Sequence, residues 1–137
     1  MPEVKLYPDA LFVLEALKKK GKQIALITTS LRDNVHYLLD KYNLHNFFDV
    51  VITNEDTTLH KPHPDPLYKA LEKLGGTRER AVIIGDSDKD VDTASHAGVD
   101  SILFYPDAHE KFYELSELQA LRPTYTVRDF REVTEIV

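Results

Sequence analysis

The 137-residue sequence contains no cysteine, and its basic residues are few and scattered. The absence of cysteine excludes disulfides and thiolate metal sites, so a metal must use oxygen or histidine ligands, and it fits a reducing compartment. No basic run is longer than Lys18–Lys20, and 23 acidic against 17 basic residues give a formal charge of −6. Nucleic acid and anionic membranes are therefore poor partners.

Long hydrophobic runs are also lacking. Apolar runs such as Ala10–Leu14 and Ile24–Ile27 fall far short of the roughly 20 residues of a membrane span, and Met1–Lys5 hold no apolar segment of signal-peptide length. We therefore expect no membrane partner and a cytoplasmic location. The length and the 42% hydrophobic content, with no repeat or linker, predict a single domain over residues 1–137.

Short, continuously apolar segments alternate with segments of helical periodicity along the chain. The apolar segments predict strands buried on both faces at 23–28, 49–53 and 81–84, then a strand at 101–105 and an edge strand at 125–127. Helices are predicted at 9–20, 30–43, 65–74, 89–97 and 108–121, and from 129 onward. This alternation predicts an α/β fold, a three-layer Rossmann-like parallel sheet with helices on both faces.

Polar residues directly before the periodic segments predict the helix starts. The predicted N-caps are Asp9, Ser30 with Asp33 in a capping box, Asp65 before Pro66, and Asp129 with Glu132 three residues on.

The residues that follow the strands are the candidate site, because ligands bind at the carboxyl ends of parallel strands. Thr28 and Thr29 follow the first strand and offer hydroxyls and backbone amides at the start of a helix, where anions bind. Lys61 lies in the loop after the second strand and offers a positive charge. Asp86 and Asp90 follow the third strand. With a divalent cation, this set could neutralise a phosphoryl group.

The two carboxylates Asp86 and Asp90 predict a Mg²⁺ site, because hard oxygen ligands favour this ion and it readily shares a phosphate. A calcium loop is the competing interpretation, since Asp86, Asp88 and Asp90 fit its first acidic positions. It fails, because Val91 stands where glycine is needed and Ala97 where glutamate is needed.

The remaining polar residues of this region have structural interpretations. We expect Gly85 to permit a sharp turn and Ser87 to cap the next helix. Three histidines show no zinc spacing and are predicted to be surface or loop residues: His60, His63 and His96.

Taken together, these segments resemble the haloacid dehalogenase (HAD) superfamily of aspartate-nucleophile phosphatases, in the branch of phosphoglycolate phosphatases and β-phosphoglucomutases. Residues 24–28 resemble the family's second motif, 60–65 the third and 82–98 the fourth, in the family's order. The resemblance implies hydrolysis of small phosphomonoesters with Mg²⁺. It implies phosphate binding by Thr28, Thr29 and Lys61, with Thr28 and Lys61 as supporting catalytic residues, and metal binding by Asp86 and Asp90.

The family's first motif is missing from this sequence. That motif is an Asp-x-Asp-Gly-Thr segment whose first Asp is the nucleophile and whose second is the general acid and base. The nearest candidates do not fit: Asp9-Ala10-Leu11 opens a helix, and residues 54–58 lie in the loop before Lys61. The sequence begins after this segment and after the helical cap that follows it in the family. We therefore expect a HAD-like core domain that lacks a cap and that by itself forms no aspartyl-phosphate.

The missing motif also has a structural consequence. In the family its strand lies in the middle of the sheet, between the strand ending at Thr28 and the one ending at Ile84. These two strands either pair directly, or a segment from another copy or another polypeptide fills the slot. A homo-oligomer or a complementing segment is thus expected. Two alternatives to an enzyme stay open: a non-catalytic binding or assembly module, and a fragment completed by another polypeptide.

Overall fold

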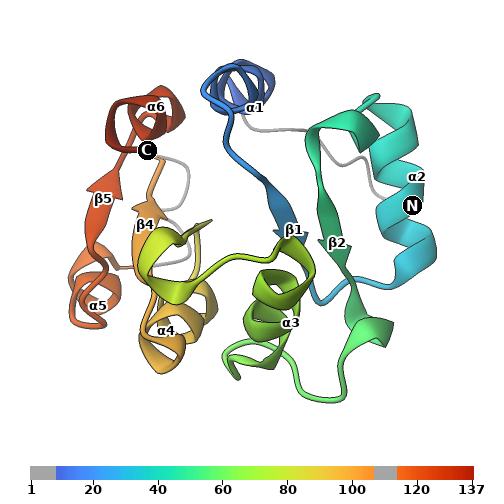
Figure 1. The fold of residues 1–137 in the computed structure, drawn as a ribbon. Coiled ribbons are helices and arrows are strands. Elements are labelled where there is room, and N and C mark those ends of the chain that lie inside the picture. Colours follow the sequence, from blue (N-terminus) through green and yellow to red (C-terminus); the bar gives the residue numbers. More distant parts are fainter. Residues whose placement is uncertain (1–8, 107–113) are drawn as a thin grey trace.

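The computed structural model describes residues 9–106 and 114–137, which form two helical layers around a layer of strands (Figure 1). The α-helices are α1 (Ala10–Lys19), α2 (Arg32–Lys41), α3 (Asp65–Leu74), α4 (Asp88–Ala97), α5 (Leu115–Gln119) and α6 (Val133–Ile136). The strands are β1 (Ala25–Ile27), β2 (Val50–Ile52), β3 (Val82–Gly85), β4 (Asp100–Phe104) and β5 (Tyr125–Val127). Short 3₁₀ helices are η1 (His45–Phe47), η2 (Asn54–Asp56), η3 (Arg78–Arg80) and η5 (Phe130–Glu132).

The strands form two separate parallel sheets. In one, β1 pairs with β2 in a register that sets Leu26 opposite Val51. In the other the order is β3-β4-β5, with Ile84 opposite Ile102 and Leu103 opposite Thr126. The parallel pairing and the helices on both faces confirm the predicted α/β class.

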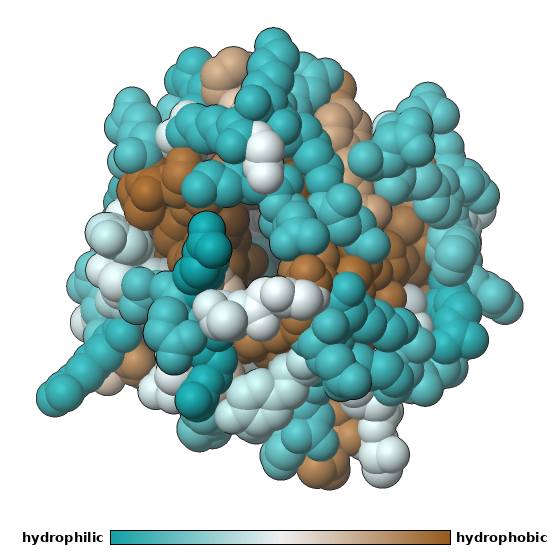
Figure 2. Space-filling view, in the orientation of Figure 1, coloured by the Kyte–Doolittle hydropathy of each residue, from teal (hydrophilic) through white to brown (hydrophobic). Residues whose placement is uncertain are grey.

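A gap separates the edge strand β1 of one sheet from the edge strand β3 of the other. Within residues 9–106 and 114–137, β1 pairs only with β2, and β3 pairs with β4. The strands flanking the gap therefore do not pair directly, and the central strand of the family is absent from the described part of the chain. Figure 2 shows a hollow in this region with hydrophobic residues around it.

The predicted burial is incomplete in the first three strands: every residue of β1 and β3, and Val50 and Val51 of β2, is only half-buried. By contrast, Ser101–Phe104 of β4 are buried, because β4 has a strand on either side. A strand next to an empty neighbouring position keeps its apolar side chains partly accessible, whatever its hydrophobicity.

Two helical layers hold the sheets in one body. In α1, Val13 and Leu17 pack with Ile102 of β4, while Leu14 packs into the cluster that α2 forms over β1 and β2. On the opposite face, α3 contacts β1, β2 and α4. Successive side chains of β4 point to opposite faces of the sheet and so contact both helical layers. Ile102 packs toward α1 and α6, whereas Leu103 packs toward α4 and α5.

The start of α2 shows a cap that sequence reasoning missed. The predicted capping box of Ser30 and Asp33 is wrong: the N-cap residue is Leu31, which makes no side-chain cap. Instead, the Glu55 carboxylate accepts the Arg32 N–H at 2.8 Å and 3.1 Å. A carboxylate at a helix N-terminus satisfies an otherwise unpaired donor and complements the helix dipole.

The other helix boundaries agree with the sequence more closely. The capping box of Asp129 and Glu132 is confirmed. Asp9 is the N-cap of α1, although its φ is 70° and its side chain forms no cap hydrogen bond. In α3 the first residue is Asp65 itself, with Pro64 as N-cap, one residue before the predicted position. Of the predicted helix over 108–121, α5 is observed, and residues 107–113 lie outside the described part.

The loop after β2 is held by the Asp56 carboxylate. It accepts hydrogen bonds from Thr53 N at 2.7 Å and Thr53 Oγ1 at 2.9 Å, and the Arg32 guanidinium lies at 3.1 Å. These donors, the Thr53 N–H first among them, hold the pKa of Asp56 below its ordinary value of 3.8.

We predict that Asp56→Asn destabilises the protein at neutral pH by about 1–2 kcal/mol, since it removes a charged acceptor of three donors. A lowered pKa contributes stability that is complete above 3.8 and is lost as the pH falls through the folded-state value. The difference from wild type should therefore shrink below 3.8, as measured by urea unfolding between about pH 5 and pH 3. Asp100→Asn, at an exposed site, is the control; an Asp56→Asn difference independent of pH would contradict the prediction.

Candidate functional site

The carboxyl ends of β1 and β3 come together at Lys61. Its Nζ lies 2.6 Å from Asp90 Oδ1 and 3.5 Å from the carbonyl oxygen of Ile27, the last residue of β1. The side chains of Lys61 and Asp90 are 16% and 11% exposed, so the ion pair is largely buried. Removing either partner would leave an uncompensated charge. The structure thus joins the loop after β2 to the ends of both sheets.

The Asp90 carboxylate organises the start of α4. Besides Lys61, it accepts hydrogen bonds at Oδ2 from Ser87 Oγ at 3.0 Å and from Asp86 N at 3.2 Å. Ser87 occupies the predicted N-cap position, but its hydroxyl bonds Asp90 rather than a backbone N–H of the helix.

Gly85 has a different role from the predicted one. It is the last residue of β3, and its φ is not in the left-handed region, so a sharp turn is not what requires glycine there. A Cβ at this position would overlap the Asp90 side chain. The glycine is needed because the Asp90 carboxylate approaches the backbone closely.

Two threonines directly follow Ile27, the last residue of β1, whose carbonyl Lys61 contacts. Thr28 follows Ile27 directly and is half-buried, and its N–H donates to the carbonyl of Ile52 at 3.0 Å. Its Oγ1 accepts the Ser30 N–H at 3.1 Å, which leaves the hydroxyl hydrogen to donate elsewhere. Thr29 is exposed.

Two histidines hold the loop that carries Lys61. His60 Nε2 lies 2.9 Å from the carbonyl oxygen of Asn54, and His96 Nδ1 of α4 lies 3.1 Å from that of Pro62. Sequence reasoning predicted surface or loop residues and missed this positioning role. No sequence signal marks it, because the partners are backbone carbonyls that any residue would offer.

The carboxylates at this centre provide only part of a metal coordination shell. Across residues 9–106 and 114–137, no group of three or more histidine, aspartate or glutamate side chains could hold a metal ion. Mg²⁺ commonly keeps several waters and shares phosphate oxygens, so two carboxylates four residues apart suit its chemistry. The observed contacts bring the Lys61 ammonium and the Asp90 carboxylate to the end of β1, directly before Thr28 in the chain. A cation and a carboxylate in this position are groups that can take part in binding a phosphoryl group with a divalent cation.

Comparison with known proteins identifies the family. A sequence profile described as "Haloacid dehalogenase-like hydrolase" matches residues 1–104. The chain belongs to this family. The chain is similar to a phosphoglycolate phosphatase of Aquifex aeolicus, 37% identical over 99 residues, which are 72% of this chain and 46% of that protein. The pyrophosphatase PpaX of Bacillus mycoides is 34% identical over 128 residues, 88% of this chain and 60% of that protein.

Solved structures agree with this assignment. A HAD phosphatase from Thermococcus onnurineus superposes with a TM-score of 0.83 at 27% identity, over 96% of this chain and 58% of that one. The predicted family and branch are thereby confirmed. The chain spans about three fifths or less of the length of these HAD relatives. In the part of the chain that the structure describes, none of the helices has the length and apolarity of a membrane span.

We predict that Gly85→Ala destabilises the protein by about 1–3 kcal/mol, because the new methyl group displaces the Asp90 carboxylate from its donors. Gly76→Ala is the matched control, since its methyl group would meet only Leu71 Cδ2, at 3.7 Å. Chemical denaturation measures both. In the double variant with Asp90→Ala, the cost of Gly85→Ala should largely disappear; full additivity would refute the explanation.

Proposed function

We propose that this chain provides the phosphate-binding and Mg²⁺-binding part of a HAD-like phosphatase for small phosphomonoesters. Thr28, Thr29 and Lys61 would bind the phosphoryl group, and Asp86 and Asp90 the metal. The name of one relative, phosphoglycolate phosphatase, supports this substrate class. The family and the name of the other relative, pyrophosphatase, support hydrolysis of small phosphorylated substrates more broadly, because pyrophosphate is an anhydride and not an ester. The cytoplasmic location stays a prediction from the sequence.

One observation carries the proposal: Lys61 Nζ bonds the end of β1 and the first turn after β3 at once. This contact brings the three motif segments to one point. The phosphoryl oxygens would meet the ammonium group of Lys61 and the hydroxyl of Thr28. Such positioned charges are the main contribution that a protein makes to phosphoryl transfer.

Mg²⁺, when bound, would supply charge neutralisation for the phosphoryl group. Asp90 holds the site in shape, with Lys61 at Oδ1 and two donors at Oδ2. A carboxylate oxygen accepts about two hydrogen bonds, so Oδ1 keeps capacity for a further ligand beside Lys61. Asp86 precedes α4 and brings the second carboxylate.

Turnover by the family mechanism needs a carboxylate nucleophile that the sequence does not provide. We propose that this group comes from a complementing segment outside the sequence. The gap between β1 and β3 favours this over a self-contained binding or assembly module, because a finished module would not leave both strands without a partner on the side that faces the gap.

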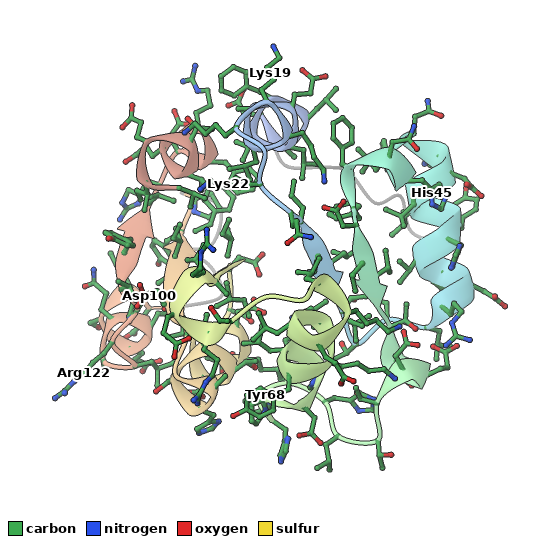
Figure 3. All side chains as sticks on the ribbon, viewed as in Figure 1. Lys19, Lys22, His45, Tyr68, Asp100 and Arg122 are labelled. Carbon is green, nitrogen blue, oxygen red and sulfur yellow. The ribbon has the colours of Figure 1, made fainter. Side chains whose placement is uncertain are left out.

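Calorimetric titration tests the binding site. Inorganic phosphate should bind the chain more tightly with Mg²⁺ than without it. Lys61→Met should weaken phosphate binding by about tenfold or more, because it removes the cation. Lys19→Met is the matched control, since Lys19 projects outward from the end of α1 (Figure 3) and the charge change is the same. An equal effect of the two substitutions would contradict the proposed site.

A turnover assay tests the missing nucleophile. The purified chain with Mg²⁺ should not hydrolyse p-nitrophenyl phosphate above the background rate. Hydrolysis by the wild type that Asp86→Ala abolishes would show that catalysis does not need another segment. Asp88→Ala, at an exposed neighbouring position, controls for general effects on this helix.

A further inference from the structure

Helix α4 contacts the loop that carries Lys61 at two separate points. In its first turn, Asp90 Oδ1 lies 2.6 Å from Lys61 Nζ. Near its end, His96 Nδ1 lies 3.1 Å from the carbonyl oxygen of Pro62. The helix positions of Asp90 and His96 are about 9 Å apart along the axis, whereas their partners are adjacent in the chain. The side chain of Lys61 therefore reaches toward the start of α4 from a backbone that is tied near its end.

His96 is the donor in this second contact. A carbonyl oxygen only accepts hydrogen bonds, so the hydrogen must be on Nδ1 of the imidazole ring. An asparagine side chain can place an amide N–H close to the position of Nδ1, whereas leucine places a methyl group there. The two substitutions therefore separate the hydrogen bond of His96 from the space that its side chain fills.

The backbone contact matters because lysine has a flexible four-carbon stem. Asp90 holds the far end of this stem, where the Lys61 ammonium group is largely buried. The ring of Pro62 locks its φ, so a bond that holds its carbonyl also restrains the peptide that joins it to Lys61. With the stem fixed at both ends, the ammonium group has few alternative positions.

We infer that His96 is a positioning residue for Lys61 and thereby sets the affinity of the site for phosphate. The inference deepens the proposed function and rests on it for the ligand. Lys61 would bind the phosphoryl group, and His96 would act only through Lys61, by holding the neighbouring carbonyl of Pro62. The hydrogen bond connects a helix with a loop, and neither partner belongs to the residues proposed to bind phosphate or metal.

A purely structural role is the alternative, because the loop continues into α3 at Asp65 and the same bond ties α3 to α4. His96 and Pro62 are both exposed, so water competes for the bond and its contribution to stability is modest. A structural tie would change the free energy of unfolding and leave the ammonium group of Lys61 and the phosphate affinity unaltered. These two readouts distinguish the roles.

Calorimetric titration of inorganic phosphate with Mg²⁺ is the first test. His96→Leu should weaken binding about three- to fivefold, because the loss cannot exceed the contribution of one exposed hydrogen bond. His96→Asn should restore the affinity to within about twofold of wild type. In the Lys61→Met background, His96→Leu should weaken binding no further. Failure of His96→Asn to restore affinity, or additive effects with Lys61→Met, would overturn the inference.

His45→Leu is the matched control for the loss of a histidine. His45 lies in η1, which precedes β2, at the opposite end of the strands from Lys61 (Figure 3), and its Nε2 contacts Asp40. This substitution should leave phosphate affinity unchanged. A loss of affinity as large as that of His96→Leu would contradict the positioning role.

NMR of the lysine ammonium groups in phosphate-free buffer is the second test. Lys61→Met identifies the Lys61 signal, whose hydrogens exchange slowly with water because the ion pair is largely buried. His96→Leu should speed this exchange about threefold or more, and His96→Asn should not. His96→Ala repeats the test without adding apolar surface, and urea unfolding shows that each variant is folded. Unchanged exchange in both apolar variants would overturn the inference. If the wild type binds no phosphate, the proposed function fails, and the exchange rates still decide whether His96 positions Lys61.

Discussion

The buried ion pair between Lys61 and Asp90 joins chain segments that no strand pairing connects in the described residues. Its position explains several neighbours. Gly85 leaves room for the carboxylate, Ser87 supplies a donor to it, and His96 on the same helix holds the loop of Lys61. A buried charge without its partner is costly, so each of these contacts helps keep both charges in place. The same contacts therefore form the candidate site and connect the two sheets.

The gap between β1 and β3 is the second feature on which the arrangement of this molecule depends. Helices cover both faces of the gap, but within the described residues neither β1 nor β3 has a paired strand on the side that faces the gap. Unpaired strand edges invite pairing with another chain. The same gap lies beside the site at which the family's first strand would deliver its aspartate. Under the proposed function, the segment that completes the layer of strands is also the one that supplies the carboxylate nucleophile.

Much of the fold, and the segments that meet at Lys61, could be predicted from the sequence. The apolar runs located β1 to β5 within one or two residues, and Gly75 and Gly98 end α3 and α4 with φ of 67° and 71°. The order of motif segments indicated the family, which the profile match confirmed. These signals are local, and side-chain periodicity and glycine conformation express them within a few residues. The roles of Thr28, Thr29, Lys61, Asp86 and Asp90 stay predictions.

The sequence alone determined the class of fold, the positions of its elements and the absence of the Asp-x-Asp-Gly-Thr segment. Each of these depends on residues that are close together in the chain. Only the tertiary structure decided that Glu55 caps α2, that Gly85 serves Asp90 rather than a turn, and that β1 and β3 stay apart. These features depend on groups distant in the chain that meet only after folding. Burial is the clearest case. An apolar run predicts a buried strand, but the elements packed against that strand determine the exposed fraction of its side chains.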